Sequence, residues 1–172
     1  TDLNLSARDV WVLDLVQHTR TRLTFDATAQ SPVWTPDGRR IAYSRSAEGV
    51  NAFANQIYWV PSDGSGTPES LVVAAGSWAP VTFEPGARGL IYHGLATEQA
   101  KAEIWQLSLA GASTPHQVLA STFHNYQPSL SPDGRWMAYV STESGRNEVY
   151  VRPYPGPGGR WQVSLDGGDE PP

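Results

Sequence analysis

The sequence predicts an all-β protein with the architecture of a β-propeller, on three observations. The 172 residues include 16 Gly and 14 Pro, a density of turn formers that suits many short strands and leaves little room for long helices. A unit of 43–48 residues recurs, and each complete unit holds four short runs rich in β-branched and aromatic residues. Four strands in a repeat of about 40–50 residues are typical of a propeller blade.

The clearest landmark of the repeat is a proline that opens each unit. Residues 32–44 read PVWTPDGRRIAYS, and residues 128–140 read PSLSPDGRWMAYV. Halfway between them, residues 80–92 read PVTFEPGARGLIY. The three leading prolines are each 48 residues apart, and Pro171 is the next candidate. We call the four strands of a unit a, b, c and d, with the leading proline on strand a.

Strands a and b should be joined by tight hairpins at Pro36-Asp37-Gly38 and Pro132-Asp133-Gly134. Pro holds φ at about −65°, and Gly accepts positive φ at low cost. This turn role explains the two most tempting carboxylates of the chain, so we expect both Asp residues to accept hydrogen bonds from turn N–H groups. Glu84-Pro85-Gly86-Ala87 in the middle unit lacks the Asp, and one extra residue precedes Tyr92, which predicts a longer or differently bulged turn.

Strands c and d have their own landmarks. Trp11, Tyr58, Trp105 and Tyr150 lie in short apolar runs, 47, 47 and 45 residues apart, and mark strand c. Apolar segments before the next proline mark strand d; these are Leu23-Thr24-Phe25, Leu71-Val72-Val73, Val118-Leu119 and Trp161-Gln162-Val163. Tyrosines that recur on strand b are expected to pack between blades, as aromatic stripes usually do; these are Tyr43, Tyr92 and Tyr139.

These landmarks predict 14 strands in one partial β-propeller domain covering 1–172. It divides into a half-blade at 9–31 and blades at 32–79, 80–127 and 128–170. A closed propeller needs about four to eight blades. We therefore expect that the chain is part of a longer protein or that it closes by self-association, since open blade faces and an unpaired strand edge favour an interface.

The motifs resemble a known family. The string P-x-W-[ST]-P-D-G-R-x-[IM]-A-Y followed by an [IV]-Y-V strand is similar to the PD40 (WD40-like) repeat of TolB-type propellers; residues 32–44 and 128–140 match it well, and 80–92 loosely. The last unit, residues 147–164, is similar to propellers appended to bacterial serine/threonine protein kinases. The resemblance implies a periplasmic or extracytoplasmic sensing or scaffolding domain.

Composition excludes several classes of function. The net charge of −5, with only short basic pairs, argues against nucleic-acid binding. No apolar run approaches the roughly 18 residues of a membrane span, so no membrane insertion is expected. The absence of Cys excludes a disulfide scaffold and thiolate metal sites. The four histidines show no metal-ligand spacing; they are His18, His93, His116 and His124.

No catalytic constellation is found in the sequence, so we expect a non-enzymatic chain without cofactor, metal or catalytic residues. The remaining candidates are loop aromatics on a rigid scaffold, where binding commonly resides. Trp78 and Tyr126 stand at the same repeat phase, two residues before a leading proline. With them we single out His124 and Asn125 in the same d–a loop as Tyr126, and Phe53 in the long b–c loop 46–55.

Three hypotheses follow. The first is a module that binds a protein or peptide partner. The second is the propeller portion of an enzyme, either the gating domain of a prolyl-oligopeptidase-like hydrolase or a hydrolase or lyase with its site in the central channel. The third is a structural half-propeller that self-assembles. The lack of a convergent acid–base pair favours the first.

Overall fold

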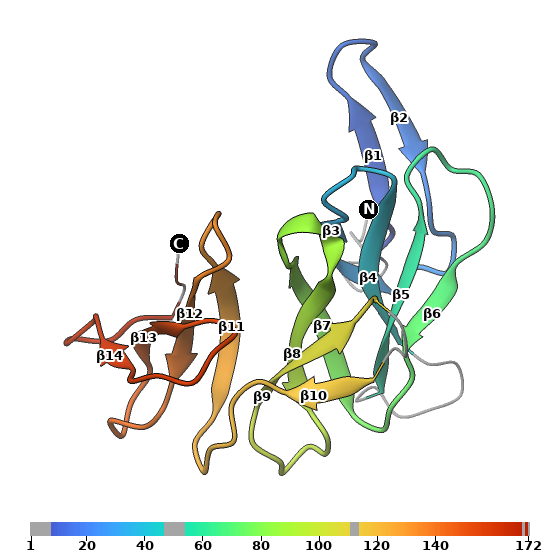
Figure 1. Ribbon diagram of the computed structural model, residues 1–172. Coiled ribbons are helices and arrows are strands. Elements are labelled where there is room, and N and C mark those ends of the chain that lie inside the picture. The colour runs from blue at the N-terminus through green and yellow to red at the C-terminus, as the bar shows by residue number, and fades with distance from the viewer. Residues whose placement is uncertain (1–7, 47–53, 111–113, 170, 172) are drawn as a thin grey trace.

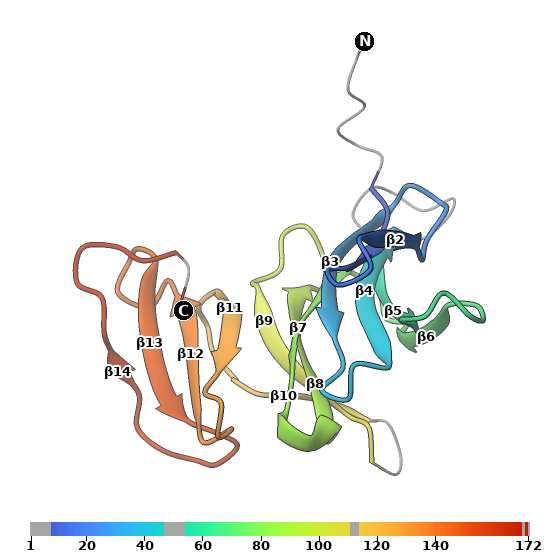
Figure 2. The same cartoon turned by 90° about the horizontal axis from the view of Figure 1, so that it is seen from above.

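The computed structural model describes residues 8–46, 54–110, 114–169 and 171. Fourteen strands lie in these residues, as the repeat predicts, and they form one two-stranded and three four-stranded antiparallel sheets. Each full sheet follows chain order from strand a to strand d. The sheets stand side by side in sequence order along an arc, which is the arrangement of propeller blades (Figures 1 and 2).

The blades have the following strands. The half-blade consists of β1 (Trp11–Asp14) and β2 (Thr19–Arg22). The first full blade consists of β3 (Ala29–Trp34), β4 (Arg40–Ser46), β5 (Asn55–Pro61) and β6 (Glu69–Val72). The second consists of β7 (Ser77–Phe83), β8 (Gly89–Leu95), β9 (Glu103–Ser108) and β10 (Pro115–Gln117). The third consists of β11 (Asn125–Leu130), β12 (Trp136–Ser141), β13 (Glu148–Pro153) and β14 (Trp161–Gln162).

The predicted Pro-Asp-Gly hairpins are confirmed. Asp37 Oδ1 accepts hydrogen bonds from the Thr35 hydroxyl at 2.7 Å and from the Arg39 N–H at 3.0 Å. Asp133 Oδ1 repeats this pattern with the Ser131 hydroxyl at 2.6 Å and the Arg135 N–H at 3.1 Å. The Ser131 hydroxyl and the Arg135 contacts lower the pKa of Asp133 to about 2. Both carboxylates therefore have the structural role that the turn sequence predicts.

The middle a–b turn is built differently, as expected. A short 3₁₀ turn, η1 (Pro85–Ala87), replaces the Pro-Asp-Gly turn, with φ of 75° at Gly86. Glu84, at its start, is buried and accepts a hydrogen bond from the Tyr154 hydroxyl at 2.5 Å and one from Gln106 Nε2 at 3.4 Å. A buried carboxylate thus ties the second blade to the c–d turn of the third.

Three hydrophobic clusters lie between successive sheets, and each contains one strand-b tyrosine, which confirms the inter-blade role predicted for these residues. Alternation along strand b directs the tyrosine toward the preceding blade and its sequence neighbour toward the following one. The clusters join Tyr43 with Val10 and Leu23, Tyr92 with Ile57 and Val72, and Tyr139 with Ile91 and Ile104.

The inner strands β7 and β11 begin earlier than the sequence predicts. Trp78, Asn125 and Tyr126 do not lie in d–a loops, because β7 and β11 begin three residues before their leading prolines. A β-bulge at each of these prolines shifts the register, so a residue without an N–H group fits inside the strand instead of starting it.

The outer strand of the half-blade is also shifted from the expected range 23–25 to residues 19–22. It is β2, because the c–d turn is short: Asp14 Oδ1 accepts the N–H groups of Val16 and Gln17, both at 2.8 Å. Leu23, which follows β2, is buried against the first full blade instead. The c–d turns of the first and third full blades contain several glycines; residues 62–68 join β5 to β6, and residues 154–160 join β13 to β14.

Candidate binding face

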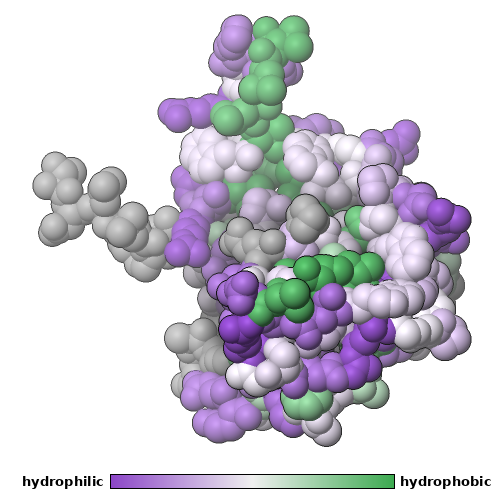
Figure 3. Space-filling model, turned by 90° about the vertical axis from the view of Figure 1, so that its left-hand side faces the viewer, coloured by the Kyte–Doolittle hydropathy of each residue, from purple (hydrophilic) through white to green (hydrophobic). Residues whose placement is uncertain are grey.

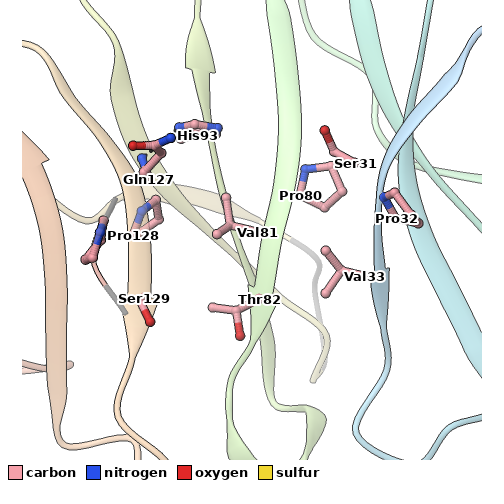
Figure 4. A pocket seen from close by; sticks show the side chains of 11 residues that line it. Ser31, Pro32, Val33, Pro80, Val81, Thr82, His93, Gln127, Pro128 and Ser129 are labelled. Atoms are coloured by element: carbon pink, nitrogen blue, oxygen red, sulfur yellow. Dashed lines mark hydrogen bonds between the residues drawn. The ribbon is translucent and has the colours of Figure 1, made fainter. Parts of the chain in front are cut away.

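The inner strands β3, β7 and β11 come together around a hollow of about 500 Å³ that we call the axial hollow. All three leading prolines line it, and so does Pro171, the next candidate in the repeat. Figure 4 shows Pro32 on β3, Pro80 on β7 and Pro128 on β11, with the side chains of Gln127 and His93 close together. The walls are mostly proline, valine and hydroxyl side chains.

A second hollow, of about 440 Å³, lies beside it, where β7 and β11 begin and β8 ends. We call it the rim hollow. It brings together three of the sequence candidates, Trp78, His124 and Tyr126, with Leu95 at the end of β8 and Glu98 from the b–c loop that follows. This is the face of the b–c and d–a loops, where the sequence predicts binding.

Trp78 is a rigid wall of the rim hollow. It is only 5% exposed and belongs to the core cluster between the first and second blades. Its Nε1 donates a hydrogen bond to the Ala75 carbonyl at 3.0 Å. The rings of Tyr92 and Trp105 meet it edge to face, with centroids 5.7 and 6.2 Å away. Most of this side chain therefore supports the fold.

Of the three candidates near the start of β11, His124 and Tyr126 line the rim hollow and Asn125 does not. His124 is exposed, and its Nδ1 accepts the Ala102 N–H at 3.1 Å, which ties the residue just before β11 to the b–c loop of the second blade. Tyr126 is half-buried, and burial raises the pKa of its hydroxyl. Asn125 is buried and does not line the rim hollow; its Nδ2 donates to the Phe123 carbonyl at 3.1 Å. Phe53 lies outside the described residues.

His93 is the residue of this face that the sequence did not single out. It lines both hollows, and its Nδ1 accepts the Gln127 N–H at 3.0 Å. Burial lowers the pKa of His93 to about 4, so the ring is neutral at pH 7 and carries its proton on Nε2. Gln127 has a φ of 49°, and its Oε1 is buried without a hydrogen-bond partner in the described chain.

The face offers aromatic surface and few charges. Within residues 8–46, 54–110 and 114–169, no three His, Asp or Glu side chains are arranged to hold a metal ion. Across the same ranges, no helix has the length and apolar character needed to span a bilayer. Of the described residues that line the axial hollow, His93 is the only one with an acidic or basic side chain.

Solved structures with a similar arrangement of sheets include TolB proteins and peptidases. A putative TolB from Agrobacterium tumefaciens has 20% identity and a TM-score of 0.72 over 87% of this chain and 52% of that one. TolB from Acinetobacter baumannii has 19% identity and a TM-score of 0.76 over 96% of this chain and 40% of that one. The fold is that of a TolB-like β-propeller, in partial form.

A puromycin-hydrolyzing peptidase from Mycobacterium tuberculosis is similar at 18% identity, with a TM-score of 0.68 over 94% of this chain and 28% of that one. At such identities the likeness concerns the fold alone. No family model and no curated protein sequence matches the chain. The chain spans about half or less of the length of these structures.

Proposed function

We propose that the chain is a non-enzymatic module that binds a protein or peptide partner through the face of its b–c and d–a loops. The observation that carries the proposal is the rim hollow, where Trp78, His124 and Tyr126 meet on one surface. Aromatic side chains held by packed strands are effective interface anchors, because little conformational entropy is lost when they bind.

The chemistry of the rim hollow defines the partner further. Trp78 and Tyr126 supply aromatic walls, and Leu95 supplies apolar surface. His93 is neutral at pH 7, so Glu98, which is exposed, provides the charge at this site. A peptide with a large apolar side chain next to a basic residue would place the first in the hollow and the second near Glu98.

The resemblance of the repeats supports a setting for this module. We place it in an extracytoplasmic compartment, as part of a larger bacterial protein of the TolB-like or kinase-linked kind with PD40 repeats. The similarity to TolB structures supports this placement at the level of the fold.

A second candidate is the propeller portion of a peptidase, and the likeness to the puromycin-hydrolyzing peptidase supports it. In that case a hydrolase domain is encoded beside this segment, and the propeller gates access to it. Sequencing the open reading frame on both sides of residues 1–172 separates the two candidates.

The experiment that tests the first candidate is selection of binders from a random peptide library. Peptides selected on the wild-type chain are measured by fluorescence anisotropy against Tyr126→Ala and against Trp34→Ala. Trp34 is an exposed aromatic residue at the opposite end of an inner strand, so its variant is the matched control. Tyr126→Ala should weaken binding about tenfold or more, and the control should not. Equal loss in both variants would contradict the proposal.

We also propose that the chain self-associates through the outer face of the third blade. Trp136, Trp161 and Val163 are 40%, 53% and 58% exposed there, and this side of the molecule is seen in Figure 3. Trp161 lies beside Val151 and Ala138 on the sheet face that corresponds to the one carrying Ala42 in the first blade. In the first blade that face is buried against the next sheet, which supports an interface here.

A further inference from the structure

A third hollow, of about 620 Å³, lies between the second and third full blades. One wall is the segment that leads from β10 to β11, which crosses between the two blades in Figure 1. The other wall is the face of the third blade that carries Tyr139 and Arg152. We call it the inter-blade hollow. It is separate from the rim hollow, with which it shares no lining residue.

Arg152 breaks the repeat at this point. On strand c of the first blade, Val60 pairs with Ile41, and on strand c of the second blade, Leu107 pairs with Leu90. Both of these strand-c residues are buried between blades, with 2% and 1% of their surface exposed. In the third blade the same register position, opposite Met137, is Arg152. The repeat predicts an aliphatic residue there, and a guanidinium group stands in its place.

The charge of Arg152 has no carboxylate partner among the described residues. The Arg152 Nε donates to the Pro153 carbonyl at 3.4 Å, and the Arg152 Nη2 donates to the Gly156 carbonyl at 3.2 Å. Two carbonyls satisfy part of the guanidinium but do not neutralise it. A partly buried cation without an anionic partner costs folding free energy. The position that stabilises the core in the other two blades therefore favours an anionic ligand in the third.

The surrounding groups complete an anion site. Arg160 lines the same hollow and is held by Glu143, with Nε 2.6 Å from Oε2. The lining therefore carries two guanidinium groups and one carboxylate, a net positive charge in a chain of net charge −5. Tyr139 is 2% exposed and lines the hollow, and its hydroxyl makes no hydrogen bond within the described part of the chain. This hydroxyl can donate to an anion bound by Arg152.

We propose that the inter-blade hollow binds a small organic carboxylate. The carboxylate contacts the Arg152 guanidinium, whose planar fork matches its two oxygens, and accepts a hydrogen bond from the Tyr139 hydroxyl. The apolar part of the ligand packs against Leu119 and Phe123, and Thr122 adds a hydroxyl at the wall. The carboxylate can belong to a free acid or to the C-terminus of a short peptide, since both present the same group.

The test uses benzoate as the probe, titrated against the full chain and followed by NMR chemical shifts, with neutral benzamide as the matched ligand. Wild type should bind benzoate saturably. It should bind benzamide at least tenfold more weakly, because the neutral amide loses a hydrogen bond between two charged groups, which is worth about a tenfold change in affinity. Arg152→Leu should weaken benzoate binding about tenfold to a hundredfold and should keep or raise the urea midpoint, because Leu restores the aliphatic residue of the repeat. Tyr139→Phe should weaken binding several-fold, whereas Tyr92→Phe, the repeat-equivalent change between the other blades, should not.

A second variant guards against loss of the fold. Arg152→Gln keeps a donor for the Pro153 and Gly156 carbonyls but removes the charge, and it should also lose benzoate. An acetylated dipeptide with a free C-terminus, compared with its amide, identifies the source: preference for the free peptide over benzoate assigns a peptide terminus, and the reverse assigns a free acid. The proposal is overturned if wild type shows no saturable binding of either carboxylate, if benzamide binds as tightly as benzoate, or if folded Arg152→Gln binds like wild type.

Discussion

Acidification to pH 5 should destabilise the fold through His93. Burial lowers the pKa of this side chain to about 4, against an ordinary value of 6.5 that applies in the unfolded chain. The unfolded chain therefore binds a proton more readily than the folded one, so the stabilisation is complete above pH 6.5 and is lost as the pH falls toward 4. At pH 5 the histidine is almost fully protonated when unfolded and about one-tenth protonated when folded, which corresponds to a loss of about 2 kcal/mol relative to pH 8.

The assay is urea unfolding at pH 8 and pH 5 for wild type and His93→Asn, whose amide oxygen can replace Nδ1 as acceptor for the Gln127 N–H. Carboxylates with a lowered pKa lose their contribution mainly below pH 5, so the window isolates the histidine. Wild type should lose about 2 kcal/mol more than His93→Asn over this range. His116→Asn, which changes an exposed histidine on β10, should behave like wild type. An equal loss in wild type and His93→Asn would refute the reasoning.

Three further predictions concern the fold and its assembly. Tyr154→Phe removes a donor from the buried Glu84 carboxylate and should lower the free energy of unfolding by about 1.5–3 kcal/mol in urea titrations; Tyr58→Phe, which removes a bond to a neutral side chain, should cost less. Asp133→Ala should lower the melting temperature, because the Ser131 and Arg135 groups of the turn lose their acceptor; an unchanged melting curve would argue against a structural role. Sedimentation should show association of wild type at micromolar concentration and a monomer for Trp161→Glu, and a monomeric wild type would contradict self-association.

The fold could be predicted from the sequence because each blade repeats its local chemistry. The Pro-Asp-Gly turns specify the hairpins, and the strand-b tyrosines specify the inter-blade packing, so local and global preferences agree. The first residues of β7 and β11 could not be predicted from this local chemistry. Proline normally marks a strand end, and only the bulge geometry shows that the chain continues through it.

The candidate site was predictable only in part. Equal repeat phase located Trp78 and Tyr126 on one surface, but it could not show that Trp78 is largely buried by Tyr92 and Trp105. His93 was missed because its environment is created by contact between two successive blades, and its partner Gln127 lies 34 residues further along the chain. The one available signal was that it stands where the other repeats have Ser44 and Val140. Arg152 likewise becomes informative only when the strand register aligns it with buried aliphatic residues.

Hydrogen–deuterium exchange with a library-selected peptide bound shows directly whether the chain binds a partner at the rim hollow. Exchange should be slower in residues 77–79, 94–102 and 124–126, which border the hollow. The a–b turns at 35–39 and 131–135, at the other ends of the inner strands, should exchange at unchanged rates. Protection confined to those turns, with the rim segments unaffected, would contradict the claim.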